Sequence, residues 1–211
     1  MEKKKKSSFF VRRLHSLLGL VPIGIFMCLH LVLNSGAFGG AVEYVNTIEF
    51  MRGMPFIIVM ELALIAAPII FHAFYGIYIV YLSGNNVLRY KYLRNWFYLL
   101  QRVTAIIVTI FVLFHVLTLR ILTESSVDVV ATFAAYLQNP LIFVLYAIGV
   151  IASVYHFANG LFTLLITWGV IQGPRAQKIF QGITIAIFAL MSIWAVCILV
   201  SIANISFFSL F

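Results

Sequence analysis

Five long apolar runs alternate with short polar segments along the 211-residue chain. Each run reaches the roughly 20 residues that a helix rising about 1.5 Å per residue needs to cross about 30 Å of hydrocarbon. Because lipid offers no partner to backbone N–H and C=O groups, runs of this length must be helices. The pattern predicts an all-α integral membrane protein with a single membrane domain over residues 1–211. We number its helices I to V and place them near residues 14–34, 56–82, 96–119, 141–170 and 179–204.

The composition excludes a soluble globular domain, because 64% of the residues are hydrophobic, 9% are charged and the mean hydropathy is +1.09. The first run lacks a small-residue cleavage pattern and contains His30, so we expect a mature helix rather than a signal peptide. Cys28 and Cys197 lie in predicted spans without a CxxCH pattern, which excludes covalent c-type haem. Among the loops, 123–138 is long enough to hold a short surface helix.

The net charge of +8 comes from basic residues that flank the spans, so we expect no nucleic-acid partner. Five of the six acids fall on the opposite side of the predicted membrane from most basic residues. By the positive-inside rule, the N-terminus is cytoplasmic and the C-terminus is external. The cytoplasmic basic residues are Lys3, Lys4, Lys5, Lys6, Arg12, Arg13, Arg89, Lys91, Arg94, Arg102, Arg175 and Lys178, with Arg52 and Arg120 on the other side.

Four of the five histidines fall one per helix on helices I to IV: His30, His72, His115 and His156. Counted from the cytoplasmic edge at about 1.5 Å per residue, His72 and His156 lie about 15 and 21 Å deep, and His30 and His115 about 24 and 28 Å deep. In an up-and-down bundle, helices I and III lie on one diagonal and helices II and IV on the other. Depth and topology therefore sort the histidines into the same inner pair and outer pair.

Two facing imidazoles suit the axial positions of haem iron, whereas an isolated metal ion needs three or four ligands at one level. FHAFYGIY (71–78) and YHFANGLF (155–162) each place a glycine one turn after the histidine, where a porphyrin could lie against the backbone. The sequence predicts two haems b, one between His72 and His156 and one between His30 and His115, with Gly76 and Gly160 making room. Interhelical hydrogen bonding or a proton path is the alternative for any single histidine.

Other polar residues near the spans leave more than one role open. Arg102, about six residues inside helix III, either binds a haem propionate or snorkels to the interface. Glu61 near the outer surface either serves a quinone or is a carboxylate favoured by the positive end of its own helix. A quinone at the inner edge would instead meet Ser16, His15 and Asn95. For His15, beside Arg12 and Arg13, we expect a solvated interfacial position and no iron.

Several segments closely resemble the dihaem cytochrome b subunit of bacterial succinate dehydrogenase, a single-chain five-helix anchor shared with some fumarate reductases. They are RRLHSLLGLVPIGIF (12–26), PIIFHAFYGIYI (68–79), RNWFYLLQRVTAI (94–106) and YHFANGLFTLLITWG (155–169), with the surroundings of His30 and His115. The resemblance covers nearly the whole chain. It implies axial ligation at His30, His72, His115 and His156, paired helix I with III and II with IV.

The resemblance further implies a multi-pass protein of the bacterial cytoplasmic membrane. Its partners would be a flavoprotein that oxidises succinate and an iron–sulfur subunit, both on the cytoplasmic face, and it would reduce a membrane quinone, commonly menaquinone. The basic cytoplasmic face suits such docking, although the positive-inside rule explains those charges equally well. One competing interpretation is the cytochrome b anchor of a formate dehydrogenase or hydrogenase, whose ligands are distributed differently. A proton-coupled transporter, which would be colourless, is the other.

Overall fold

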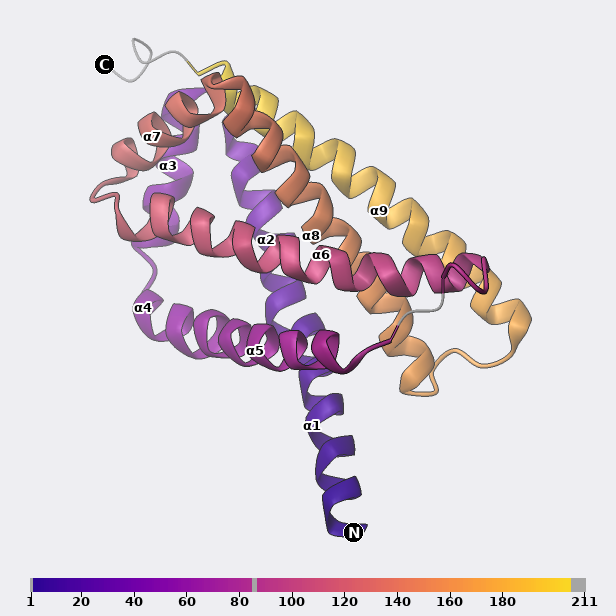
Figure 1. The fold of residues 1–211 in the computed structure, drawn as a ribbon. Helices are drawn as coiled ribbons and strands as arrows, with labels where there is room; N and C mark the ends of the chain where they lie inside the picture. The colour runs from indigo at the N-terminus through magenta and orange to yellow at the C-terminus, as the bar shows by residue number, and fades with distance from the viewer. Residues whose placement is uncertain (1, 85–86, 206–211) are drawn as a thin grey trace.

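The computed structural model describes residues 2–84 and 87–205, with side chains from residue 9 onward, and all regular structure in these ranges is helical (Figure 1). Five helical stretches are long and apolar enough to cross a membrane: Phe9–Gly39, Ile57–Leu82, Leu93–Ile121, Pro140–Thr167 and Pro174–Ala203. The predicted all-α fold with five spans is confirmed. The elements are α1 Glu2–Leu20, α2 Pro22–Asn34, η1 Ser35–Gly39, α3 Ala41–Arg52, α4 Ile57–Met60, η2 Glu61–Ala66, α5 Ala67–Leu82, α6 Leu93–Val116, η3 Leu117–Ile121, α7 Ser126–Gln138, α8 Pro140–Thr167 and α9 Pro174–Ala203.

Prolines account for two interruptions inside the spans. Val21 separates α1 from α2, directly before Pro22, which has no N–H to donate to the preceding turn. In the second span the segment η2 is π-helical and precedes Pro68 in the first turn of α5. A second π-helical segment, η3, ends the third span. Local π turns are common at functional sites, and these two lie at the same end of the second and third spans.

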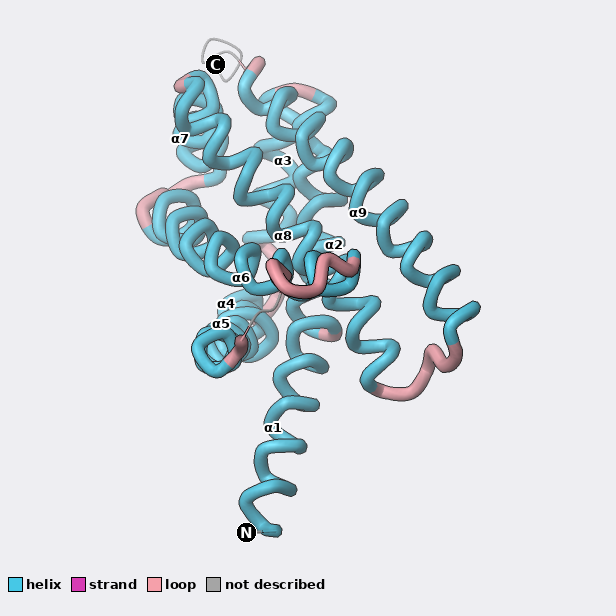
Figure 2. The backbone as a smooth tube through the Cα atoms, turned by 45° about the vertical axis from the view of Figure 1, so that its right-hand side comes forward, coloured by secondary structure: helices cyan, strands magenta, loops and turns pink. Residues whose placement is uncertain are grey.

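The spans pack as neighbours around the histidines. Helix α8 lies side by side with α9 and also packs on α6, while α1 packs on both α5 and α8 (Figures 1 and 2). Figure 2 shows α5 nearly end-on while α1 runs down the view, so these two helices cross steeply. Helix α5 also contacts α6. Four spans thus contact one another in a ring, which leaves their histidines to meet in the middle.

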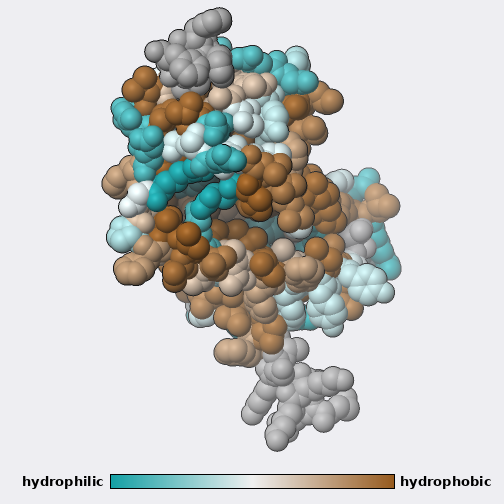
Figure 3. Space-filling model, turned by 90° about the vertical axis from the view of Figure 1, so that its left-hand side faces the viewer, coloured by the Kyte–Doolittle hydropathy of each residue, from teal (hydrophilic) through white to brown (hydrophobic). Residues whose placement is uncertain are grey.

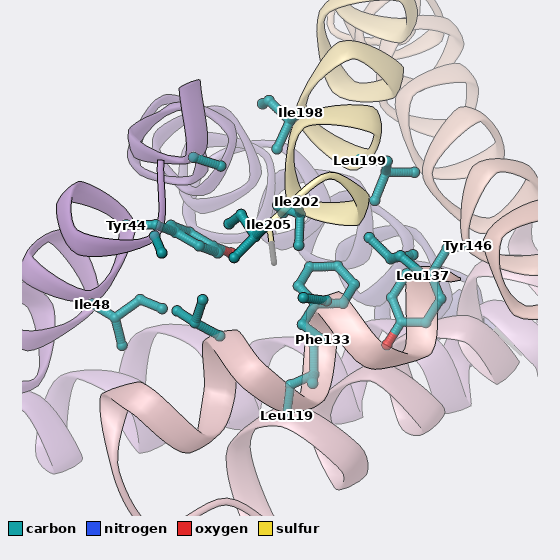
Figure 4. Close-up of a cluster of buried hydrophobic side chains, with 14 residues drawn as sticks. Tyr44, Ile48, Leu119, Phe133, Leu137, Tyr146, Ile198, Leu199, Ile202 and Ile205 are labelled. Carbon is teal, nitrogen blue, oxygen red and sulfur yellow. The ribbon is translucent and has the colours of Figure 1, made fainter. Parts of the chain in front are cut away.

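The best-buried side chains lie at the end of the bundle away from the N-terminus, where α3 and α7 cover the ends of the spans (Figures 1 and 4). Val130 and Ile202 are completely buried there, and Tyr146 is 1% exposed. The short helix expected within 123–138 is present as α7, which starts with a capping box between Ser125 and Asp128. Helix α3 was not predicted from the sequence. Both short helices pack into the protein rather than resting on its surface.

Large apolar side chains cover the outside of the spans. Phe74 is 73% exposed, Leu190 69% and Leu113 68%. Figure 3 shows apolar residues over much of one face, with hydrophilic residues gathered toward its upper part and edges. Exposed apolar surface on this scale requires an apolar solvent, which a bilayer provides. The protein is a multi-pass membrane protein.

Candidate functional site

Two pairs of histidine rings meet inside the ring of spans. The ring centroids of His30 and His115 are 5.8 Å apart, and the ring planes are inclined at 84°. Those of His72 and His156 are 6.1 Å apart, at 87°. These are the pairs that depth along the helices predicted. Their closeness is an observation, while ligation of iron by these rings stays a prediction.

The spacing of each pair fits two axial ligands on one metal ion. Two metal–nitrogen bonds of about 2 Å, together with the ring radius on each side, put the centroids of such imidazoles about 6 Å apart. Both pairs lie within a few tenths of an ångström of this value. Among residues 2–84 and 87–205, no group of three or more His, Cys, Asp or Glu side chains could hold a metal ion. The donor sets therefore suit a cofactor that supplies the other metal ligands itself, as a porphyrin does.

Polar groups of the neighbouring spans surround the inner pair. The His15 ring stacks on the His72 ring at 4.1 Å and 6°, and the His15 carbonyl oxygen lies 2.9 Å from His72 Nδ1. Thr104 Oγ1 lies 3.4 Å from His156 Nδ1, and the Gln101 amide donates to the His156 carbonyl oxygen at 3.0 Å. The expected solvated position of His15 is wrong, because its Nε2 is buried.

The two glycines predicted to make room for a porphyrin face polar side chains. A Cβ added at Gly76 would lie 3.3 Å from His15 Nε2, and one at Gly160 would lie 3.5 Å from Gln101 Nε2. Neither glycine is crowded by backbone, so the space in front of each depends on a side chain that can move. The role of Gly76 and Gly160 in cofactor binding stays a prediction.

Aromatic rings surround the outer pair. Phe26 lies 5.3 Å from His30, and Phe111 lies 5.7 Å from His115, each one helical turn before the histidine. Tyr146 and Phe133 from the buried cluster lie 6.1 and 6.3 Å from His115. The outer pair thus lies directly under the cap formed by α7. The helical spacing of Phe26 and Phe111 was visible in the sequence, whereas the contacts from Tyr146 and Phe133 depend on how the helices pack.

Arg102 has partners within the protein. Its Nε donates to Ser83 Oγ at 2.8 Å, one terminal nitrogen donates to the Tyr98 carbonyl oxygen at 2.8 Å, and the guanidinium lies 3.2 Å from the centre of the Tyr98 ring. Ser83 directly follows α5, so Arg102 links the second and third spans at their shared end. Binding of a propionate by Arg102 stays a prediction.

Glu61 forms an ion pair with Arg120, with contacts of 2.8 and 3.1 Å between the carboxylate and the guanidinium. The pair joins the π-helical segments η2 and η3 and is partly exposed, at 33% for Glu61 and 47% for Arg120. Nothing in the sequence spacing predicted this pairing. It gives Glu61 a structural partner, and the quinone role remains to be tested.

The residues predicted for an inner-edge quinone are placed differently. Ser16 donates to the Arg13 carbonyl oxygen at 3.0 Å and accepts from Trp168 Nε1 at 3.4 Å. Asn95 donates to the Tyr90 carbonyl oxygen at 2.8 Å. His15 is committed to the His72 ring. Each of the three already has an intramolecular contact, and their quinone role stays a prediction.

Comparisons with known proteins decide the family. Residues 84–200 match the succinate dehydrogenase/fumarate reductase transmembrane subunit family, which covers more than half of the chain. The chain is also 42% identical over 185 residues to the succinate dehydrogenase cytochrome b558 subunit of Bacillus subtilis (strain 168), covering 87% of this chain and 92% of that protein. The chain belongs to the succinate dehydrogenase/fumarate reductase transmembrane subunit family. It is a cytochrome b-type membrane anchor of a bacterial membrane, as the sequence resemblance predicted.

Family membership narrows the interpretations that the sequence left open. It favours the succinate dehydrogenase/fumarate reductase group over anchors of formate dehydrogenases or hydrogenases and over a proton-coupled transporter. Sequence reasoning did not identify Thr104, Gln101 or Gly19, all of which contact the inner histidines of this family member. Thr104 and Gln101 share one face of α6 at a spacing of three residues, which a search for polar residues facing the histidines would have found.

Proposed function

We propose that this chain is the cytochrome b subunit of a succinate dehydrogenase and that it holds two haems b on the route from an iron–sulfur subunit to a membrane quinone. The observation that carries the proposal is the presence of two crossed histidine pairs with centroids 5.8 and 6.1 Å apart. Hydrogen bonding between helices would explain one such pair, but it does not account for two pairs at the separation expected for axial ligands.

In this proposal His72 and His156 hold the inner haem, and His30 and His115 hold the outer one. Haem supplies reversible one-electron transfer, and the protein sets its potential through axial ligation, burial and nearby charge. The chain's own contribution is to fix the imidazoles on four different helices, so that neither site forms unless the bundle is assembled. Aromatic rings exclude water from the outer site, whereas polar groups of α1 and α6 surround the inner one.

The proposed orientation places the N-terminus and the basic connections in the cytoplasm. There a flavoprotein subunit and an iron–sulfur subunit would dock on the basic face. Contacts among its residues support a shaped surface: Arg94 donates to Gln177 at 2.6 Å, which ties the start of α6 to α9, and Arg13 lies against Phe9 and Trp168. The inner haem is then the one nearer to the incoming electrons.

The electron acceptor in this proposal is a quinone of the bilayer, with menaquinone as the expected type. The outer candidate site is at Glu61, where the ion pair with Arg120 must loosen before the carboxylate can exchange a proton with a quinone. The inner candidate site involves Ser16, His15 and Asn95. The contacts of His15 with His72 favour the outer site, because His15 cannot serve a quinone without leaving its stacked position.

A set of four substitutions tests the haem assignment, and it works even when neither spectrum has been assigned to a particular haem. Each ligand is changed in turn: His30→Leu, His72→Leu, His115→Leu and His156→Leu, in the complex with its own partner subunits. Reduced-minus-oxidised spectra of the His72 and His156 variants should retain one and the same haem, and those of the His30 and His115 variants should retain the other. Any other grouping of the four spectra contradicts the pairing.

A further inference from the structure

We propose that α1 and α6 set the tautomer and ring plane of the inner pair: the His15 carbonyl and the Thr104 hydroxyl accept the Nδ1–H groups of His72 and His156, which leaves both Nε2 atoms free for iron. This inference rests on the proposed haem-binding function and adds positioning groups to it. Imidazole ligands of metals commonly donate their other N–H to a carbonyl or a similar acceptor, which fixes the ring and makes the ligand more basic.

The contact at His72 determines where its proton lies. A carbonyl oxygen can only accept a hydrogen bond, so at 2.9 Å from the His15 oxygen the Nδ1 of His72 must carry the hydrogen. In a neutral imidazole, the other nitrogen then has a free lone pair. His72 is thus held in the form that can bind a metal through Nε2.

One turn of α1 also holds the plane of the His72 ring. The His15 ring stacks on one face at 4.1 Å, with an angle of 6° between the planes. At the ring edge Gly19 is in such close contact with His72 Cε1 and Nδ1 that an added Cβ would clash with both atoms. Positions 15 and 19 are four residues apart and share one face of α1, so a single helix turn touches the ring from two sides.

The contact at His156 follows the same logic through a side chain. The Thr104 hydroxyl donates to the Leu100 carbonyl oxygen at 2.7 Å, so its hydrogen is engaged by its own helix. Its oxygen is then free to accept from His156 Nδ1 at 3.4 Å, which again leaves Nε2 unprotonated. Thr104 is only 8% exposed, so water does not readily replace it as the acceptor.

Helix α6 also fixes the backbone that carries His156. Gln101, one turn before Thr104, donates to the His156 carbonyl oxygen at 3.0 Å, and Asn159 donates to Gln101 Oε1 at 2.7 Å. The amide of Gln101 is therefore oriented by Asn159 and bound to the ligand residue at the same time. Ring and main chain of His156 are both tied to the same face of α6.

The outer pair lacks this arrangement in the described part of the chain. The Nδ1 of His115 is buried and has no hydrogen-bond partner there. Its neighbours are the rings of Phe111, Phe133 and Tyr146, which pack against the imidazole. Substitutions at Thr104 or Gly19 should therefore affect the inner haem and leave the outer one unchanged.

The test is Thr104→Val, which keeps the shape of the side chain and removes the acceptor, in the purified complex with its partner subunits. Thr104→Ser restores the acceptor. Thr109→Val is the matched control, because the Thr109 hydroxyl bonds only to the Ala105 carbonyl oxygen of the same helix. Haem release from the oxidised protein to apomyoglobin is followed optically, and the low-spin ferric signals of the two haems are recorded by electron paramagnetic resonance.

In Thr104→Val, release of the inner haem should be about tenfold faster, as expected for loss of an outer-shell partner, and the low-spin signal of this haem should shift. Thr104→Ser and Thr109→Val should behave as wild type. An inner haem with unchanged release and signal in Thr104→Val refutes the inference. Equal loss of both haems also refutes it, because that result indicates general destabilisation.

Gly19→Ala provides a second variant on the other helix, with Gly182→Ala as its control, because a Cβ at Gly182 meets nothing within 4 Å. The added methyl should displace the His72 ring and shift only the inner signal. An unshifted inner signal contradicts the role of α1. A wild-type complex without haem would instead overturn the proposed function itself, so the two failures are distinguishable.

Discussion

Truncation of Phe133 tests whether the α7 cap stabilises the outer histidine pair. This ring is 5% exposed, lies 5.0 Å from the Tyr146 ring and lies 6.3 Å from the His115 ring (Figure 4). Phe133→Ala empties on the order of 100 Å³, and at about 24 cal/mol per Å³ the cavity alone costs about 2.4 kcal/mol. The lost transfer of the ring from water adds to this, so we expect a destabilisation of about 3–5 kcal/mol.

The assay for Phe133→Ala is unfolding by titration with sodium dodecyl sulfate, together with the fraction of each haem retained. Leu190→Ala is the control, because this side chain is 69% exposed on a span and would face lipid, so its truncation leaves no internal cavity. The outer haem should be lost before the inner one in Phe133→Ala. A free energy of unfolding within about 0.5 kcal/mol of the control, the range of ordinary surface substitutions, refutes the role of the cap.

Three further predictions concern charged groups. Hydrogen bonds from the Ser125 hydroxyl and backbone N–H lower the pKa of Asp128, so its cap stabilises α7 above about pH 4 and is lost as the pH falls through the lower folded-state pKa; hydrogen exchange of α7 should rise in acid, and in Asp128→Asn that dependence should disappear. Glu61 and Arg120 are partly exposed, so a double-mutant cycle should give a coupling of about 0.2–1 kcal/mol, whereas Glu61→Gln should raise the KM for quinone severalfold; an unchanged KM excludes the quinone role. Arg102→Gln should lower the midpoint potential of the inner haem by removing a positive charge, and Arg102→Lys should restore it; equal potentials favour the snorkelling alternative.

The five spans could be predicted because apolar length is a property of the sequence alone. Their ends could not be placed as well: the first span begins at Phe9 rather than near residue 14, because the helix continues through polar residues that reach beyond the hydrocarbon. Helix α3 was missed because its apolar residues, such as Tyr44 and Ile48, are buried only after α7 covers them. Its stability depends on tertiary packing more than on its own sequence.

The histidine pairs could be predicted because depth is counted along each helix and does not depend on how the helices cross. Contacts around the pairs depend on that crossing. His15 was expected at a solvated edge, yet the steep crossing of α1 and α5 brings its ring onto His72. The contact of Thr104 with His156 likewise requires the rotation of α6 about its axis, which an apolar span with few polar residues specifies weakly.

The central claim is that this chain carries two haems b, and the most direct measurement is the ratio of haem to chain in the purified complex, by pyridine haemochrome assay and amino-acid analysis. The partner subunits carry no haem in this account, so all haem counted belongs to this chain. The account predicts two haems per chain, with two components in a redox titration. One haem per chain would contradict one of the two pairs, and a colourless chain would contradict both.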